Sequence, residues 1–189
     1  CSTTCLAPVI KLLNDAFTIT DGFVTTVHSY TTDQVVTDVM HKDLRRARAA
    51  ASSIIPTSTG ITTCLKRVVK NLTRGCMNAL ALRVPTITGS LVDITVNVRQ
   101  DVTREQVNQI FHDAAATEQL HSIISYTEEP IVSADIVDDP HSAIIDGLST
   151  MVLPNQSGAL VKVLSWYDNE WMYACRCADL INKLAQFIQ

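Results

Sequence analysis

The sequence predicts an α+β fold, in which a mixed, largely antiparallel sheet is covered by helices. Strand-like segments follow one another at hairpin-length spacing, whereas strict alternation with helices would indicate a parallel sheet. The chain has 189 residues, of which 47% are hydrophobic and 18% are charged, so it is long and apolar enough to enclose a core. No linker or shift in composition interrupts it, and we expect one domain over residues 1–189.

The first quarter of the chain predicts a helix, a strand and a long loop. An apolar stretch predicts the helix over residues 9–17, with Pro8 in or near its first turn. Gly22 interrupts the pattern, and the β-branched run over residues 23–28 then predicts a strand. Residues 31–53 show no periodicity and include several arginines, so we expect a long loop followed by a short helix.

A turn rich in hydroxyl groups follows at residues 54–60 and opens a helix that we expect to run to about Leu72. Hydroxyl groups and a glycine at a helix start can bind an anion through outward-pointing N–H groups, but they also form ordinary N-caps. The pattern alone favours the cap. Residues 79–84 and 91–99 then predict two strands, the second with strict alternation of polar and apolar residues.

The second half begins with a helix and continues with strands. Thr103 and Gln106 form the ends of a capping box, which predicts a helix through Ala116. Further strand-like segments lie at residues 122–127, 131–136, 142–146, 149–153 and 159–167. A last helix is expected over about residues 169–187, and one of its faces carries Trp171, Ala174, Ala178, Ile181, Leu184 and Ala185.

The composition excludes several classes of function. A formal net charge of −4 argues against general nucleic-acid binding, although a local cationic pocket remains compatible with it. The six glycines form neither a dinucleotide-binding fingerprint nor a P-loop. No apolar run is long enough to span a membrane. The six scattered cysteines indicate a reducing, cytoplasmic location, and they form no metal-ligand spacing with the histidines, so we expect no metal.

A cysteine and a histidine are the candidate catalytic pair. Cys1 lies at the start of the first predicted helix, where unpaired N–H groups stabilise a thiolate. His28 ends the first predicted strand and offers a base. Two other interpretations stay open: Cys1 and Cys5 are buried thiols on one helix face, or Cys1 is an amino-terminal nucleophile of an amide hydrolase, with its own amino group as base.

Six short motifs occur in order along nearly the whole chain. They are residues 1–8 (CSTTCLAP), 25–34 (TTVHSYTTDQ), 43–50 (DLRRARAA), 55–60 (IPTSTG), 82–86 (LRVPT) and 165–171 (SWYDNEW). Each motif is weak by itself, but six in register are highly specific. Together they resemble the catalytic half of the phosphorylating glyceraldehyde-3-phosphate dehydrogenases.

This resemblance implies a set of site residues. Cys1 would be the catalytic cysteine and His28 its base. Three further sites would bind the substrate's own phosphate (Thr31, Asp33 and Arg83), inorganic phosphate (Ser2, Thr59 and Gly60) and the nicotinamide (Asn169 and Tyr173). The arginine-rich stretch 45–48 would belong to a long loop that lines the cofactor site and subunit contacts.

The resemblance also implies a reaction. Glyceraldehyde 3-phosphate would be oxidised and phosphorylated to 1,3-bisphosphoglycerate, with NAD or NADP as cofactor, through a hemithioacetal and then a thioester on Cys1. The family forms homotetramers, and its dinucleotide-binding Rossmann half, which precedes the cysteine, is absent from this sequence. We therefore expect the catalytic portion of a longer protein.

Two alternatives remain within the resemblance. Residues 139–144 resemble the erythrose-4-phosphate dehydrogenase branch, although residues 58–60 fit the glyceraldehyde-phosphate branch better. A non-catalytic assembly module of the same fold is the other alternative. Met172 stands where the family has glycine, and we expect its side chain to crowd the nicotinamide.

Overall fold

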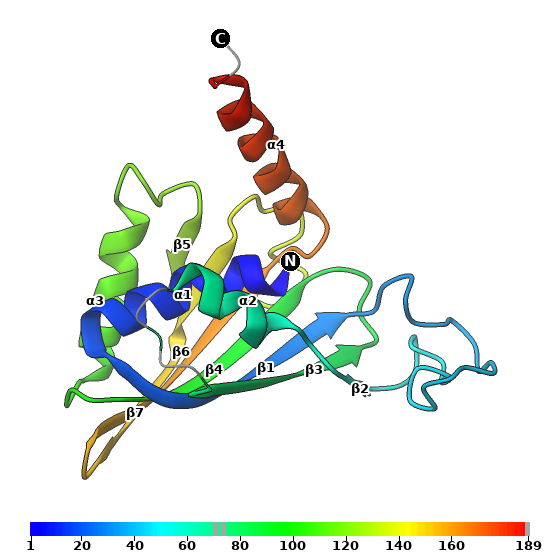
Figure 1. The fold of residues 1–189 in the computed structure, drawn as a ribbon, viewed down its shortest axis with the longest axis horizontal. Helices are drawn as coiled ribbons and strands as arrows, with labels where there is room; N and C mark the ends of the chain where they lie inside the picture. Colours follow the sequence, from blue (N-terminus) through cyan, green and yellow to red (C-terminus); the bar gives the residue numbers. More distant parts are fainter. Residues whose placement is uncertain (70–71, 73–74, 188–189) are drawn as a thin grey trace.

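The computed structural model describes residues 1–69, 72 and 75–187. These residues form four helices and one seven-stranded sheet (Figure 1). The helices are α1 (Ser2–Phe17), α2 (Ile61–Val68), α3 (Arg104–Ala115) and α4 (Trp171–Ala185). The strands are β1 (Ile19–Ser29), β2 (Ile55–Thr57), β3 (Met77–Val84), β4 (Ser90–Val98), β5 (Ile124–Thr127), β6 (Ala143–Asn155) and β7 (Gly158–Tyr167).

The predicted fold class is confirmed. The strand order is β2-β3-β1-β4-β7-β6-β5, in which β1 with β3 and β5 with β6 pair in parallel. The other four pairings are antiparallel, so the sheet is mixed and largely antiparallel. Because β1 and β3 pair in parallel, the carboxyl-terminal ends of both strands lie side by side, and the end of β1 is next to the start of α1.

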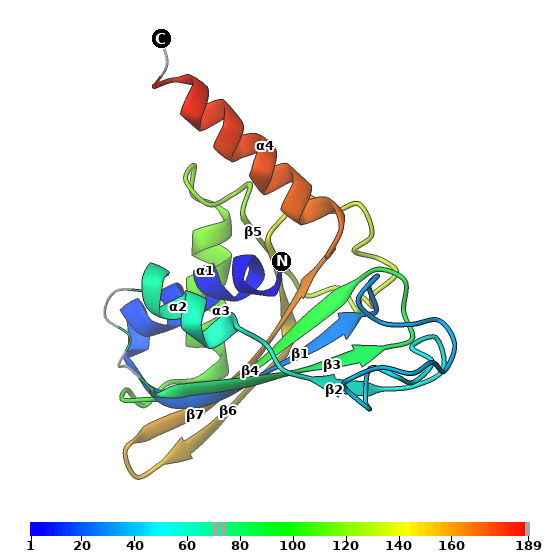
Figure 2. The same ribbon diagram turned by 45° about the vertical axis from the view of Figure 1, so that its right-hand side comes forward.

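The core lies between one face of the sheet and the helices α1, α2 and α3 (Figures 1 and 2). Alternate residues of β4 and β7 supply the sheet's side of this core, and Ile94 and Val163 are fully buried there. α1 contributes Leu6, Ile10 and Leu13 from one stripe, which is why an apolar pattern of helical spacing marked it in the sequence.

The opposite face of the sheet carries no helix among the described residues. Phe23 is 70% exposed on it, and Leu80, Met151 and Leu153 are also exposed. The strand register places these four side chains on the same face as the ion pair of Lys162 with Asp93. The paired positions that show this are Phe23 with Thr95, Leu80 with Thr25, Met151 with Lys162, and Leu153 with Leu160. The expectation that helices cover the sheet therefore holds for one face.

Several local predictions are corrected by the structure. α1 begins at Ser2, so Pro8 lies inside the helix and not in its first turn, and its missing N–H leaves out the hydrogen bond to the carbonyl of Thr4. Residues 131–136 form turns and not a strand, residues 31–53 contain no helix, and the short strand β2 within residues 54–60 was not expected. The second predicted helix ends at Val68 and not at about Leu72, because Val69 has an extended backbone; residues 70–71 lie outside the described ones.

The two helices of the second half, α3 and α4, differ in how they begin and in how they pack. α3 has the predicted capping box, in which Thr103 accepts from Gln106 N and Gln106 accepts from Thr103 N. α4 projects away from the sheet (Figures 1 and 2), and its predicted apolar face is exposed: Trp171 is 49% and Ile181 66% exposed. The buried residue of α4 is Met172, which packs into the core. No described helix is long and apolar enough to cross a membrane.

Candidate active site

The structure brings the predicted nucleophile and base together. Cys1 is the N-cap residue of α1, and His28 lies near the end of β1 on the face that α1 covers. The Cys1 Sγ atom is 3.2 Å from His28 Nε2, although the two residues are 27 positions apart. This distance allows direct proton transfer between the thiol and the imidazole.

The hydrogen bonds of His28 determine which ring nitrogen faces the sulfur as an acceptor. Nδ1 is 2.6 Å from the carbonyl oxygen of Ser29, a contact that requires a proton between the two atoms. Arg83 Nη1 lies 2.8 Å from Nδ1 and 3.0 Å from the same carbonyl oxygen, and we assign its hydrogen bond to the carbonyl, which can accept from both groups. Nδ1 therefore carries the proton of the neutral ring, and Nε2 presents its lone pair to Cys1.

His28 is almost completely buried, and this burial favours the neutral ring. Burial lowers the pKa of His28 to about 4, although the hydrogen bond to Ser29 O opposes the shift and the nearby charge of Arg83 adds to it. The imidazole is therefore an unprotonated base at neutral pH. The neutral imidazole can therefore accept the proton of Cys1.

A pocket of about 280 Å³ opens above the pair. Its described lining comes from α1, β1, the β2–α2 turn, α2 and β3. The lining residues are Cys1, Ser2, Thr3, His28, Ser58, Thr59, Gly60, Ile61, Cys64, Ala81 and Arg83, and none of these is acidic. Two helices, α1 and α2, begin at this pocket without an acidic residue in their first turns. Their unpaired N–H groups and the guanidinium of Arg83 make it suitable for an anion.

Arg83 reaches the pocket because of the strand register. β3 pairs in parallel with β1 so that Arg83 lies directly beside His28, on the same face of the sheet. Burial lowers the pKa of Arg83, and the carboxylate of Asp33 opposes that shift. The arginine therefore provides the fixed positive charge next to the base.

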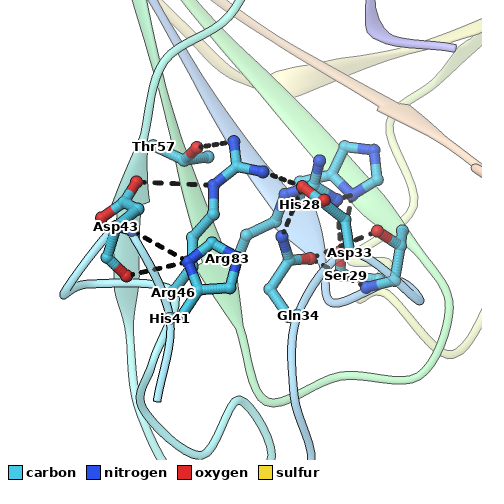
Figure 3. A network of polar contacts seen from close by, with 10 residues as sticks. His28, Ser29, Asp33, Gln34, His41, Asp43, Arg46, Thr57 and Arg83 are labelled. Carbon is cyan, nitrogen blue, oxygen red and sulfur yellow. Dashed lines mark hydrogen bonds and ion pairs between the residues drawn. The ribbon is translucent and has the colours of Figure 1, made fainter. Parts of the chain in front are cut away.

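The predicted substrate-phosphate residues Thr31 and Asp33 lie in the loop after β1 and do not line this pocket. Thr31 N and Oγ1 donate to Gln34 Oε1 at 3.0 and 3.2 Å. Asp33 forms an ion pair with Arg46, whose Nη2 donates to Thr57 Oγ1 at 2.7 Å (Figure 3). The sequence analysis placed Arg46 in the arginine-rich loop but did not predict its contacts with Asp33 and Thr57, because the partners lie 13 and 11 residues away.

The predicted nicotinamide residues lie at the junction of β7 and α4. Asn169 is 8% exposed, and its Oδ1 accepts a hydrogen bond from Ser90 Oγ at 2.8 Å. Ser90 in turn accepts from Ser29 N, which connects Asn169 to the backbone beside His28. Tyr173 is 52% exposed on the first turn of α4. Met172 is fully buried and packs into the core.

Two further contacts were not predictable from the sequence. Ser2 Oγ is 2.8 Å from the hydroxyl of Tyr167, which is 165 residues away and fully buried on β7. Cys5 is also fully buried, and its Sγ lies 3.2 Å from Ser165 Oγ. The buried-thiol interpretation therefore applies to Cys5 and not to Cys1. No group of three potential metal ligands occurs within the part of the chain that is described.

The comparisons with known proteins identify the family. The chain matches the family described as "Glyceraldehyde 3-phosphate dehydrogenase, C-terminal domain" over residues 1–169. It is 52% identical to glyceraldehyde-3-phosphate dehydrogenase 2 of Bacillus subtilis over 185 residues, which are 98% of this chain and 53% of that protein. The chain belongs to the glyceraldehyde-3-phosphate dehydrogenase family.

Other relatives agree on this family. The glyceraldehyde-3-phosphate dehydrogenase of Borreliella burgdorferi is 51% identical over 98% of this chain and 55% of that protein. That of Mycobacterium avium is 50% identical over 96% of this chain and 52% of the relative. The chain thus spans about half the length of the curated family members it matches. The erythrose-phosphate branch is not favoured, because these relatives are all named for glyceraldehyde 3-phosphate.

Proposed function

We propose that residues 1–189 are the catalytic domain of a phosphorylating, NAD- or NADP-dependent glyceraldehyde-3-phosphate dehydrogenase. The observation that carries this proposal is the 3.2 Å contact between Cys1 Sγ and His28 Nε2, at the bottom of a pocket that has no acidic residue in its described lining. A thiol beside a neutral base suits nucleophilic attack on a carbonyl carbon. An adjoining anion site suits a substrate that carries phosphate.

In the first step, the Cys1 sulfur adds to the aldehyde carbon and its proton passes to His28 Nε2. The resulting imidazolium keeps its orientation, because Nδ1–H still donates to the carbonyl of Ser29. The imidazolium then gives this proton to the oxygen of the adduct, which completes the hemithioacetal and restores the neutral base. Oxidation of the hemithioacetal gives a thioester on Cys1, and the hydroxyl proton passes to His28 Nε2 in that step. Inorganic phosphate attacks the thioester carbon and releases 1,3-bisphosphoglycerate, which returns the sulfur to its starting state.

Two anions must bind near Cys1 in this reaction, and different groups would hold them. Ser2, Thr59 and Gly60 lie at the starts of α1 and α2, where hydroxyl and N–H donors suit inorganic phosphate. Arg83, Thr31 and Asp33 would hold the phosphate of the substrate. The negative charge of Asp33 would oppose an anion, but its ion pair with Arg46 compensates that charge.

The nicotinamide would be held by Asn169, with Tyr173 beside it. One donor of the Asn169 amide is engaged by Glu170 and one acceptor position by Ser90, which leaves a donor and an acceptor for a carboxamide. The residues present therefore fit this group. When bound, the nicotinamide supplies the two-electron acceptor for the oxidation.

Assembly into a homotetramer and a cytoplasmic location complete the proposal. The helix-free face of the sheet supports assembly, because Phe23 and Leu80 are 70% and 46% exposed there at diagonal positions of the paired strands β1 and β3, and adjacent exposed apolar side chains mark interaction surfaces. A Phe23→Glu variant should then elute from a sizing column at a smaller mass than the parent. Scattered cysteines without a disulfide framework support a reducing compartment.

A direct assay tests the activity. The protein that contains this chain is mixed with glyceraldehyde 3-phosphate, inorganic phosphate and NAD or NADP, and reduced nucleotide is followed by absorbance. Phosphate-dependent reduction is expected, Cys1→Ser should abolish it, and Cys177→Ser, at an exposed cysteine on α4, should not change it. Absence of reduction with both nucleotides would refute the proposal in favour of a non-catalytic assembly module. Faster turnover of erythrose 4-phosphate than of glyceraldehyde 3-phosphate would instead make erythrose 4-phosphate the substrate of this protein.

A further inference from the structure

The candidate pocket contains a second thiol that the proposed reaction does not use. Cys64 lies on α2, one turn beyond Gly60, and lines the same cavity of about 280 Å³ as Cys1. Its backbone N–H donates to the carbonyl of Gly60 at 3.3 Å, so it belongs to the first turn of the helix. Cys64 is exposed, whereas Cys1 is half-buried. Both sulfurs are therefore reached from one solvent-filled space.

Cys5 is nearer to Cys1 in sequence, but its environment makes it unreactive. The side chain is fully buried in the core, and its Sγ contacts Ser165 Oγ at 3.2 Å. Burial raises the pKa of Cys5 to about 12, and the contact with Ser165 opposes that shift only in part. A thiol that stays protonated and has no access to solvent cannot attack a neighbouring sulfur. Cys64 is thus the accessible thiol of the pocket besides Cys1.

We propose that Cys64 is the resolving thiol for oxidised Cys1, so that the two form a reversible disulfide across the pocket. A hydroperoxide first oxidises the Cys1 sulfur to a sulfenic acid and is itself reduced to water or an alcohol. The Cys64 thiolate then attacks that sulfur, an S–S bond forms, and the hydroxyl group leaves as water after taking up a proton. A dithiol reductant reverses the step and regenerates both thiols.

The local structure permits the approach that a disulfide requires. The Cα atoms of a disulfide-bonded pair lie roughly 4.4–6.8 Å apart, so the first turn of α2 must be able to approach the start of α1. α2 packs against α1, and its N-cap residue Gly60 has no side chain, so the first turn is held from outside the helix by the hydrogen bond from Ile61 N to Thr59 Oγ1 at 3.4 Å. The space around Gly60 is open, with no atom within 4 Å of the position that a Cβ would take. The pairing does not depend on the proposed dehydrogenase activity, since it needs only two reactive thiols.

Peptide mapping after peroxide treatment tests the pairing. The protein is treated with hydrogen peroxide, quenched with catalase, blocked with iodoacetamide and digested with trypsin. Cys64 is the only cysteine of the tryptic peptide 49–66, and Cys1 and Cys5 share the peptide that ends at Lys11. We expect these two peptides to be disulfide-linked, with the link assigned to Cys1 by fragmentation. A link to Cys5, or no link while Cys1 is oxidised, would overturn the proposal.

A pair of variants adds a functional measurement. Without a resolving thiol, the sulfenic acid is oxidised further to forms that thiols do not reduce, so Cys64→Ser should lower the dithiothreitol-recoverable fraction of Cys1 by about tenfold. Cys177→Ser removes an equally exposed thiol on α4 and should leave recovery unchanged. Equal recovery in all three proteins would overturn the proposal. Alkylation of untreated Cys1 by iodoacetamide, measured in parallel, reports on the nucleophile itself and separates this result from a failure of the proposed activity.

Discussion

Replacement of His28 by asparagine tests the role of the base most directly. The imidazole Nε2 lies 3.2 Å from Cys1 Sγ, which is within direct proton-transfer distance. With a pKa of about 4, the ring is neutral at pH 7, so almost the whole population has a base available. A positioned general base contributes roughly 10²–10⁴-fold to a rate, or about 3–5 kcal/mol of activation free energy. His28→Asn should slow acyl transfer to Cys1 by that factor.

The assay uses an activated ester, because its reaction with the thiol needs neither nucleotide nor phosphate. The protein that contains this chain is mixed with p-nitrophenyl acetate, and the first-turnover release of p-nitrophenolate measures acylation of Cys1. Cys1→Ser fixes the background. His112→Asn is the matched control, since His112 is exposed on α3, outside the candidate pocket, and should leave the rate unchanged. A decrease of less than about tenfold in His28→Asn would refute the role of His28 as the base.

Three further predictions concern stability and binding. The pKa of His28 falls from 6.5 to about 4 on folding, so the unfolded chain binds more protons than the folded chain between these pH values. Urea unfolding should therefore give a free energy of unfolding that is about 3 kcal/mol lower at pH 4 than at pH 7 because of this group. The His28→Asn variant should not show this loss. Gly22→Ala should lower the free energy of unfolding by about 2–4 kcal/mol in the same measurement, since the Cβ atom of the alanine would lie 2.6 Å from Thr95 O. Gly60→Ala is the control, because its Cβ atom would meet no atom within 4 Å, and its effect should be nearly neutral. Arg83→Gln should raise KM for glyceraldehyde 3-phosphate by about 10–100-fold but not that for glyceraldehyde, and an equal effect on both would contradict a phosphate contact.

The sequence by itself determined the features that depend on neighbouring residues. The capping box at Thr103 forms as predicted, because both of its hydrogen bonds join residues three positions apart. The alternation over residues 91–99 correctly indicated a strand with one buried face, since successive side chains of a strand point to opposite sides. Cys1 and His28 could be selected as candidates because a cysteine at a helix start and a histidine at a strand end are residue types that form a nucleophile with its base.

Only the tertiary structure decided which of these groups meet. The parallel register of β1 with β3 places Arg83 beside His28, and no local pattern specifies a pairing between strands that are more than 50 residues apart. The same is true of Cys64, which lines the same cavity as Cys1 although the two residues are far apart in the sequence. The apolar side of α4 looked like a core face but is exposed in this chain, because periodicity shows that a helix has an apolar side and not what covers it. Local propensity therefore fixed the elements, whereas long-range packing fixed the site.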